Sequence, residues 1–253
     1  MSWAARRRFL ILFGIGAVVV AFLVTVLIST LYKTPTCSDN VQNQGEQGID
    51  CGGPCPYLCT ATEQPPVVLF TQVLNVGRRT DLIAEVENKN SNAAAKDVPY
   101  TISLYNAKHA LIQKVNGTID LLPATTEPVY IPAVYSGTQK VTSAFLSINS
   151  SLPEWFILTK NSYVVPTVSN ITKSGTVSNP RIEATITNPS FSALTDVTVI
   201  IFVHDAKNNV IAASRTLIPS LDGQGQAIAT FTWNNPFPSA PALFQIVPIP
   251  QLP

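Results

Sequence analysis

Three patterns of hydrophobic and polar positions occur along this chain, and the first to consider is an uninterrupted apolar run at the N-terminal end. Residues 9–32, FLILFGIGAVVVAFLVTVLISTLY, contain no charged side chain. A helix over these 24 residues would be about 36 Å long, enough to cross a hydrocarbon core of about 30 Å with some tilt. The apolar region of a cleavable signal peptide is usually only about 7–15 residues long. The run therefore predicts one transmembrane helix at residues 9–32, with a cleaved signal as the alternative.

Charged residues flank this run unevenly. Arg6, Arg7 and Arg8 lie just before it, whereas only Lys33 follows closely. The positive-inside rule places the more basic flank in the cytoplasm. We therefore expect a single-pass membrane protein, with residues 1–8 cytoplasmic and the part after Lys33 extracellular or periplasmic.

The second pattern, an alternation with a period of two, begins after a Pro-containing linker at residues 60–66. Runs of β-branched and aromatic residues are separated by Asn, Gly, Pro and Ser. In TVIIFVHDAKNNVIAAS, residues 198–214, two apolar runs flank DAKNN, which is typical of a β-hairpin loop. Several short strands per domain favour an immunoglobulin-like β-sandwich, with a closed barrel as the alternative.

This β pattern occurs twice. DLIAEVENKNSN from Asp81 matches RIEATITNPSFS from Arg181, and DVPYTISLYNAKHALI from Asp97 matches DVTVIIFVHDAKNNVI from Asp196. AFLSI from Ala144 matches ALFQI from Ala242, so that the offset stays close to 100 residues throughout. We predict an all-β ectodomain of two tandem immunoglobulin-like β-sandwiches, at residues 67–160 and 161–253. The segment between the copies, residues 153–166, is either the last strand of the first copy or a connector.

The third pattern is a polar segment, TCSDNVQNQGEQGIDCGGPCPYLC, that lies between the apolar run and the β repeats. It occupies residues 36–59 and contains all four cysteines of the chain, Cys37, Cys51, Cys55 and Cys59. Outside the cytoplasm, cysteines are normally oxidised to disulfides. We predict a small disulfide-rich module, whose pairing the sequence leaves open because four cysteines allow three pairings. A structural zinc site is the alternative.

Oxygen-bearing side chains lie between the first two cysteines of this module. Asp39, Asn43, Glu46 and Asp50 carry the hard oxygen ligands that Ca²⁺ prefers, in a short loop that contains Gly45 and Gly48. Their spacing is not that of an EF-hand loop. The alternative role of these side chains is to cap turns through hydrogen bonds to the backbone. Calcium is therefore a candidate ion, and no cofactor is required.

The cysteine segment resembles a motif of secreted and membrane-anchored bacterial proteins, especially those of candidate-phyla bacteria, C-x-D-G-x-Q-N-x-G-E-x-G-x-D-C-G-G-x-C-x-x-C. Asn40 replaces the usual Gly, and the last gap is one residue longer than in the motif. The matching residues are Cys37, Asp39, Gln42, Asn43, Gly45, Glu46, Gly48, Asp50, Cys51, Gly52, Gly53 and Cys55.

The two β repeats resemble the FxLYD-type and related immunoglobulin-like domains of prokaryotic envelope proteins. This resemblance implies a fold and an envelope location, and it implies no activity. The residues that carry it are Val86, Asn88, Asp97, Val98, Leu104, Tyr105 and Asn106 in the first copy, and Ile186, Asn188, Asp196, Val197, Val203, His204 and Asp205 in the second.

Composition narrows the function classes. Removing Arg6, Arg7, Arg8 and Lys33 from the 16 basic residues leaves 12 against 15 acidic ones, without a basic cluster. Nucleic acid is therefore not an expected partner. No nucleophile, zinc-protease or phosphate-loop motif is present. Both histidines, His109 and His204, are expected at the surface or beside loops. We therefore expect no catalytic residues.

Aromatic residues have two interpretations. They either form a sugar- or peptide-binding face or fill sandwich cores and domain junctions. The residues concerned are Trp155, Phe156, Tyr163, Trp233, Phe237 and Phe244.

The sequence predicts a non-enzymatic, membrane-anchored surface protein that binds, spaces or scaffolds a protein partner, with exposed strand edges as one route to docking. The alternatives are a subunit of a larger envelope assembly and a surface hydrolase. A hydrolase would require a pocket lined by convergent polar groups.

Overall fold

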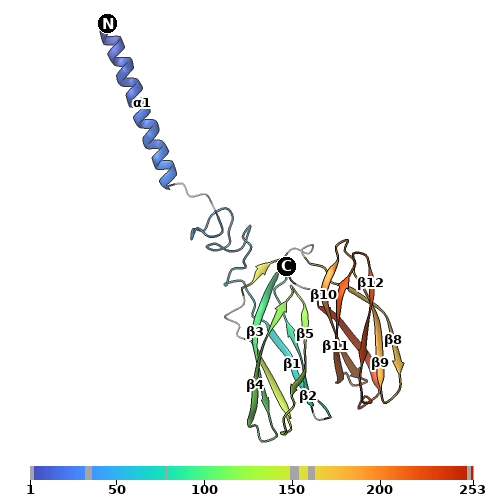
Figure 1. Cartoon of the computed structure of the whole chain (residues 1–253). Helices are drawn as coiled ribbons and strands as arrows, with labels where there is room; N and C mark the ends of the chain where they lie inside the picture. Colours follow the sequence, from blue (N-terminus) through green and yellow to red (C-terminus); the bar gives the residue numbers. More distant parts are fainter. Residues whose placement is uncertain are drawn as a thin grey trace. The chain divides into compact units, whose positions relative to one another are not determined.

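The computed structural model describes residues 3–31, 36–77, 79–148, 154–158, 163–249 and 252. These residues form one helix and thirteen strands, shown in Figure 1. The chain divides into two compact units, Met1–Cys59 and Thr60–Pro253.

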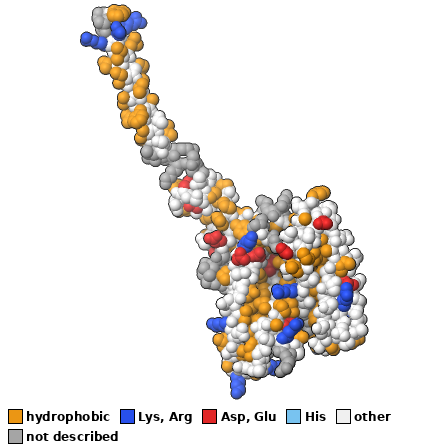
Figure 2. Space-filling view, in the orientation of Figure 1, with side chains coloured by type: hydrophobic (Ala, Val, Ile, Leu, Met, Phe, Trp, Pro, Cys, Tyr) orange, Lys and Arg blue, Asp and Glu red, His pale blue; other side chains and the backbone are white. Residues whose placement is uncertain are grey.

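Helix α1 (Trp3–Leu31) is the apolar element of the first unit. Its segment Arg6–Ser29 contains an 18-residue stretch with a mean hydropathy of 3.0 and is long enough to cross a membrane, a property shared by membrane anchors and signal sequences. Figure 2 shows hydrophobic side chains along the helix and basic side chains at its N-terminal end. The hydroxyls of Thr25 and Ser29 donate to the backbone carbonyls of Ala21 and Val26, so these polar groups are satisfied within the helix.

The rest of the first unit is the cysteine module, residues 36–59, which contains two disulfides as predicted. Cys37 is bonded to Cys55, and Cys51 is bonded to Cys59. Gly48 lies against the second disulfide, where an added Cβ would be 2.8 Å from the Cys51 sulfur. The need for Gly at this position is therefore steric.

The second unit begins with a β-sandwich of one three-stranded and one four-stranded sheet. One sheet has the order β1-β2-β5 and the other β4-β3-β6, with the short β7 (Phe156–Ile157) paired to the start of β3. This pairing assigns residues 156–157 to the first copy, while the predicted boundary at residues 160 and 161 lies outside the described residues. The strands are β1 (Val67–Val76), β2 (Arg79–Glu87), β3 (Ala93–Tyr105), β4 (Leu111–Leu121), β5 (Thr126–Tyr135) and β6 (Ser143–Ile148).

A second sandwich repeats this topology, with sheets β8-β9-β12 and β11-β10-β13. Val67 pairs with Glu87 in the first copy and Thr167 pairs with Thr187 in the second, which agrees with an offset of 100 residues. The sheets form sandwiches and not a closed barrel. The strands are β8 (Thr167–Gly175), β9 (Pro180–Thr187), β10 (Leu194–Asp205), β11 (Val210–Leu221), β12 (Gln226–Thr232) and β13 (Pro241–Ile249).

A buried asparagine in each copy explains the shared Asn of the repeat. The Asn188 side-chain amide donates to the carbonyls of Ser192, Leu221 and Asp222, and its oxygen accepts the N–H of Ser190. In the first copy the Asn88 amide donates to the carbonyls of Ala93 and Leu122, and its oxygen accepts the N–H of Asn90. Each asparagine thus joins the loop after the second strand of its sandwich to the loop after the fourth strand.

The two sandwiches pack face to face within the second unit, side by side in Figure 1. Val199, Ile201 and Val203 of β10 point into the core of their own sandwich. Ile200 and Phe202 point to the other side and pack against Leu74, Ile83 and Tyr130 of the first sandwich. Because side chains alternate along a strand, β10 is buried on both faces. We call this contact the inter-sandwich interface.

The copies differ where this interface requires apolar side chains. Ile83, Leu74 and Tyr130 occupy the positions of Glu183, Ser174 and Thr230 in the second copy, whose corresponding sheet is not covered. Conversely, Ile200, Phe202 and Ala213 of the second copy correspond to Thr101, Ser103 and Lys114 of the first. The polar counterparts are all at least partly exposed. Each copy is therefore apolar on the outer face that meets its neighbour and more polar on the other.

Candidate functional site

The four candidate calcium ligands lie together in the cysteine module, where the three carboxylates accept hydrogen bonds from the backbone. The Asp50 carboxylate accepts the N–H groups of Asp39 and Asn40, at 3.0 and 2.9 Å. The Glu46 carboxylate accepts the N–H groups of Asn43 and Asp50, at 3.2 and 3.3 Å. These are the side-chain to backbone hydrogen bonds that the turn-capping interpretation predicts. Asn40, which stands where the motif has Gly, adopts the left-handed conformation with φ of 60°.

Asp39 and Asn43 complete the set. One Asp39 oxygen accepts the N–H of Val41 and the other accepts the Asn43 amide, each at 2.9 Å. The Asn43 oxygen is buried and has no hydrogen-bond partner among the described residues. Most of the oxygens that could bind an ion are thus occupied in holding turns, and calcium binding stays a prediction.

One further group in this module has the composition of a metal site. A Glu46 oxygen and the sulfurs of Cys37 and Cys55 lie within 4.8 Å of one another. The two sulfurs are bonded to each other, so neither is the thiolate that a metal would bind. The zinc alternative therefore requires reduction of this disulfide.

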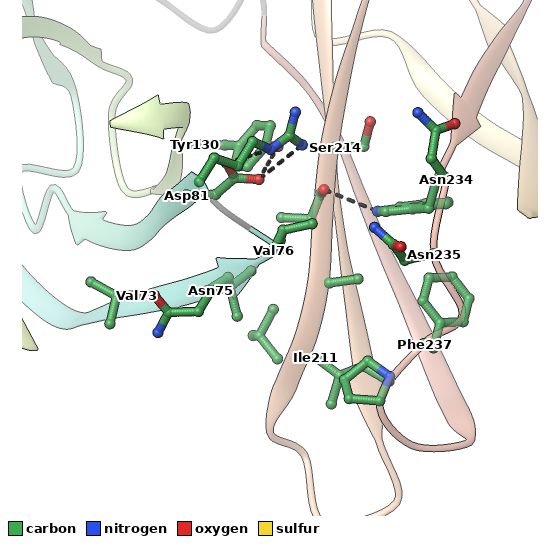
Figure 3. A pocket seen from close by; sticks show the side chains of 18 of the residues that line it. Val73, Asn75, Val76, Asp81, Tyr130, Ile211, Ser214, Asn234, Asn235 and Phe237 are labelled. Atoms are coloured by element: carbon green, nitrogen blue, oxygen red, sulfur yellow. Dashed lines mark hydrogen bonds and ion pairs between the residues drawn. The ribbon is translucent and has the colours of Figure 1, made fainter. Parts of the chain in front are cut away.

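A cleft in the second unit brings together a different set of side chains. It lies between the two sandwiches and has a volume of about 660 Å³. Its walls come from β1, from β11 and from the loop that follows β12. In Figure 3, Val73, Asn75 and Val76 lie on one side, and Asn235 and Phe237 lie on the other. We call this site the inter-sandwich cleft.

The six aromatic residues singled out in the sequence are divided between cores and this cleft. Trp233 and Phe237 line the cleft, with ring centroids 5.0 Å apart and an edge-to-face arrangement. Phe244 packs against the core of the second sandwich. The remaining three belong to the packed interior. Trp155 is buried, and Phe156 and Tyr163 pack against a small cluster of Ala94, Leu122, Leu158 and Leu252.

A buried carboxylate fixes an arginine at the wall of the cleft. Asp81 is 2% exposed and lies 3.1 Å from the Arg79 Nε, while it also accepts Arg79 Nη2. The Tyr130 hydroxyl and the Ala133 N–H donate to the same carboxylate, at 3.0 and 2.8 Å. Burial, followed by the nearby Asp81 charge, raises the pKa of the Tyr130 hydroxyl, which therefore stays a donor. Asp81 is fully occupied and acts by orienting Arg79.

The two histidines occupy different environments. His109 is exposed in the β3–β4 turn, where it adopts φ of 56°. His204 lies beside the β10–β11 loop, with its Nδ1 3.4 Å from the Asn208 carbonyl oxygen, which is one of the two expected locations. It is buried and not at the surface, because the first sandwich covers that face of β10. Its Nε2 lies 3.0 Å from the side-chain oxygen of Gln245, whose amide donates to Glu85 of the first sandwich. His204 thus belongs to a polar contact across the inter-sandwich interface.

Sequence reasoning missed the cleft, since its walls come from strands far apart in the chain. Arg79, Asp81 and Ser214 were not among the candidate residues. The sequence did contain a signal for the covered face. Ile83 and Glu183 occupy equivalent positions in the two copies but differ in polarity, and the apolar residue marks the outer face that the other sandwich covers. The cleft borders the face that this comparison identifies.

The fold and the cleft define a class: a paired β-sandwich protein with a disulfide module, an N-terminal apolar helix and a mixed polar and aromatic cleft. Neither a scan against protein-family models nor a search of curated proteins finds a match to this chain. The resemblances of the cysteine segment and the β repeats therefore stay predictions.

Proposed function

We propose that this chain is a membrane-anchored surface protein whose paired sandwiches present the inter-sandwich cleft to an extracellular ligand. The observation that carries the proposal is the specialisation of the two copies. Their facing surfaces are apolar and fix one sandwich against the other, so the cleft has walls from two domains that cannot move independently without exposing this interface. A preformed cleft with a few convergent polar groups is typical of a ligand site.

Anchoring is supported by the apolar helix and the three arginines that precede it. Helix α1 stays attached in this proposal, with residues 1–8 in the cytoplasm and the β unit outside, extracellular or periplasmic. The disulfides of the cysteine module are consistent with an oxidising compartment.

The cleft supports binding better than hydrolysis. Glycoside hydrolysis generally uses two carboxyl groups, and Asp81 is the one acidic side chain in the described lining. The Asp81 oxygens already accept hydrogen bonds from Arg79, Tyr130 and Ala133, so Asp81 is not placed to act as a base.

The proposal is tested with the full-length chain on intact cells and in lipid nanodiscs. External protease should digest the β unit on intact cells while a tag at the N-terminus stays protected. Envelope material should change the fluorescence of Trp233, and this change should be lost in Phe237→Ala. Phe191→Ala is the matched control, because Phe191 is 93% exposed and does not line the cleft. Release of the chain by cleavage after α1, or equal signals from both variants, would contradict the proposal.

A second candidate function is a subunit of a larger envelope assembly. It is favoured by an exposed apolar patch on the outer face of sheet β4-β3-β6. Phe145 is 65% exposed, packs edge-to-face on Tyr105 and shares this face with the half-exposed Leu111. Native extraction in mild detergent tests this candidate: a fixed stoichiometry with other proteins that is lost in Phe145→Ser supports it, and a monomer that is unaffected by Phe145→Ser excludes it.

A further inference from the structure

Resting on the proposed function, we infer that the inter-sandwich cleft binds a short carbohydrate segment. A cleft of about 660 Å³ falls within the range of about 300–1,000 Å³ found for small-ligand sites. Three features of its walls indicate the class of ligand. These are an aromatic surface, a set of amide and guanidinium groups, and backbone carbonyls that already accept hydrogen bonds from side chains.

The aromatic surface is rigid. The Trp233 indole N–H donates to the carbonyl of Ala213 at 3.1 Å, and the ring also contacts Phe237 edge-to-face. With its polar group satisfied, Trp233 offers the cleft only carbon surface. A flat apolar surface of this kind suits the C–H face of a pyranose ring.

Polar side chains surround this surface. Asn234 and Asn235 are exposed, and neither side chain makes a hydrogen bond within the described part of the chain. A primary amide both donates and accepts, as a sugar hydroxyl does, so each asparagine can satisfy neighbouring hydroxyls. Arg79 lies on the opposite sandwich, where Asp81 fixes its guanidinium and half of its side chain stays exposed. Its remaining N–H groups are donors for hydroxyl oxygens.

The backbone argues against an extended peptide. A peptide that added a strand to the edge of β11 would need the free backbone carbonyls of β11 as acceptors for its own N–H groups. On the cleft side, the Val210 carbonyl already accepts the Gln72 amide at 3.1 Å, and the Ala213 carbonyl accepts Trp233. Strand addition would have to break both contacts. A ligand held by side chains, as a carbohydrate is, leaves them intact.

The experiment uses the full-length chain in nanodiscs, applied to two arrays, one of immobilised oligosaccharides and one of immobilised peptides. The strongest saccharide is then titrated against the wild type, Phe237→Ala, Asn235→Ala and the control Phe191→Ala. We expect saccharide binding that weakens about tenfold in Phe237→Ala and about threefold to tenfold in Asn235→Ala, as losses of an aromatic contact and of a hydrogen bond. Phe191→Ala should bind as the wild type does.

Each other outcome overturns the inference. Saccharide binding that both cleft variants retain places the sugar elsewhere. Peptide binding that Phe237→Ala abolishes refutes the ligand class and leaves the proposed binding function standing. No binding to either array refutes the carbohydrate inference, while the protease and Trp233 measurements decide the proposed function independently. Asn235 is exposed, so Asn235→Ala keeps the test valid if Phe237→Ala fails to fold.

Discussion

Replacing Ile83 by Glu, the residue found at the equivalent position of the second copy, should separate the two sandwiches. Ile83 is fully buried in the inter-sandwich interface, against Phe202 and Ile200 among others. Truncating such a side chain costs about 2–5 kcal/mol, and an unpaired buried carboxylate adds several more. Because separation of the sandwiches returns the carboxylate to water, the loss is limited to the free energy that holds them together. We expect a loss of about 3–5 kcal/mol.

The assay is equilibrium unfolding of the full-length chain in urea, monitored by tryptophan fluorescence and by circular dichroism. The wild type should unfold in one transition, because each sandwich is stabilised by the other. Ile83→Glu should lower the unfolding midpoint and divide the curve into two transitions, since the core of the second sandwich does not include Ile83. Limited proteolysis should then cut β1 and β11, which the interface and the cleft partly cover.

Glu183→Ile is the matched control. Glu183 occupies the equivalent position on the uncovered sheet and contacts Arg181 near the surface. Surface ion pairs contribute about 0–1 kcal/mol, so this variant should unfold almost as the wild type does. A single transition for Ile83→Glu, with a midpoint equal to that of Glu183→Ile, would refute the argument that this face holds the sandwiches together.

Three further predictions follow from individual side chains. Asn188→Ala should lower the free energy of unfolding by about 3 kcal/mol, because three carbonyls lose a buried donor; the exposed Asn116→Ala should change it by less than about 0.5 kcal/mol in the same urea assay. Burial raises the pKa of Glu127 above its ordinary value, although its hydrogen bond with Thr125 opposes this shift. The protonated Glu127 side chain therefore contributes its full stabilisation below pH 4.5, and this stabilisation is lost as the pH rises through the raised pKa. Between pH 4 and 8, the urea midpoint of Glu127→Gln should fall less than that of the wild type. Parallel pH profiles for the two proteins would contradict this. Asp50→Ala should loosen the cysteine module, because the N–H groups of Asp39 and Asn40 lose their acceptor and their amide hydrogen exchange should become faster. Protection of these amides that rises when calcium is added to the wild type would support the calcium prediction, and unchanged protection would favour turn capping alone.

Local features were predictable from the sequence because they depend on local pattern. The apolar run predicted α1, the alternation predicted the β repeats, and four clustered cysteines predicted two disulfides. The pairing of Cys37 with Cys55 was not predictable, since it depends on how the turns at Asp39, Glu46 and Asp50 fold the loop. The alignment of the two repeats also holds for the backbone of the hairpin turns. His109 in the β3–β4 turn aligns with Asn208 in the β10–β11 turn, and both residues have positive φ, 56° and 63°.

The interface and the cleft were harder to predict, because they depend on contacts between residues far apart in the chain, such as Gln72 and Val210, which are 138 positions apart. Arg79 and Phe237 line one cleft, yet neither belongs to a recognisable motif. The continuous apolar run of β10, Val199 to Val203, contained partial information, since a strand buried on both faces has no alternation. That signal, combined with the exchange of Phe202 for Ser103, would have located the interface without the structure.

The differences between the two copies also bear on whether the contact between sandwiches can repeat. Sheet β1-β2-β5 of one copy packs on sheet β11-β10-β13 of the next, so the contact joins two different surfaces. When a contact of this kind is repeated from copy to copy, it produces either a closed ring or an open fibre. At one end Glu183, Ser174 and Thr230, and at the other Thr101, Ser103 and Lys114, stand in place of the apolar side chains that form the inter-sandwich interface. The exchanges that distinguish the two copies therefore confine this apolar contact to the junction between the two sandwiches and leave neither outer face able to repeat it.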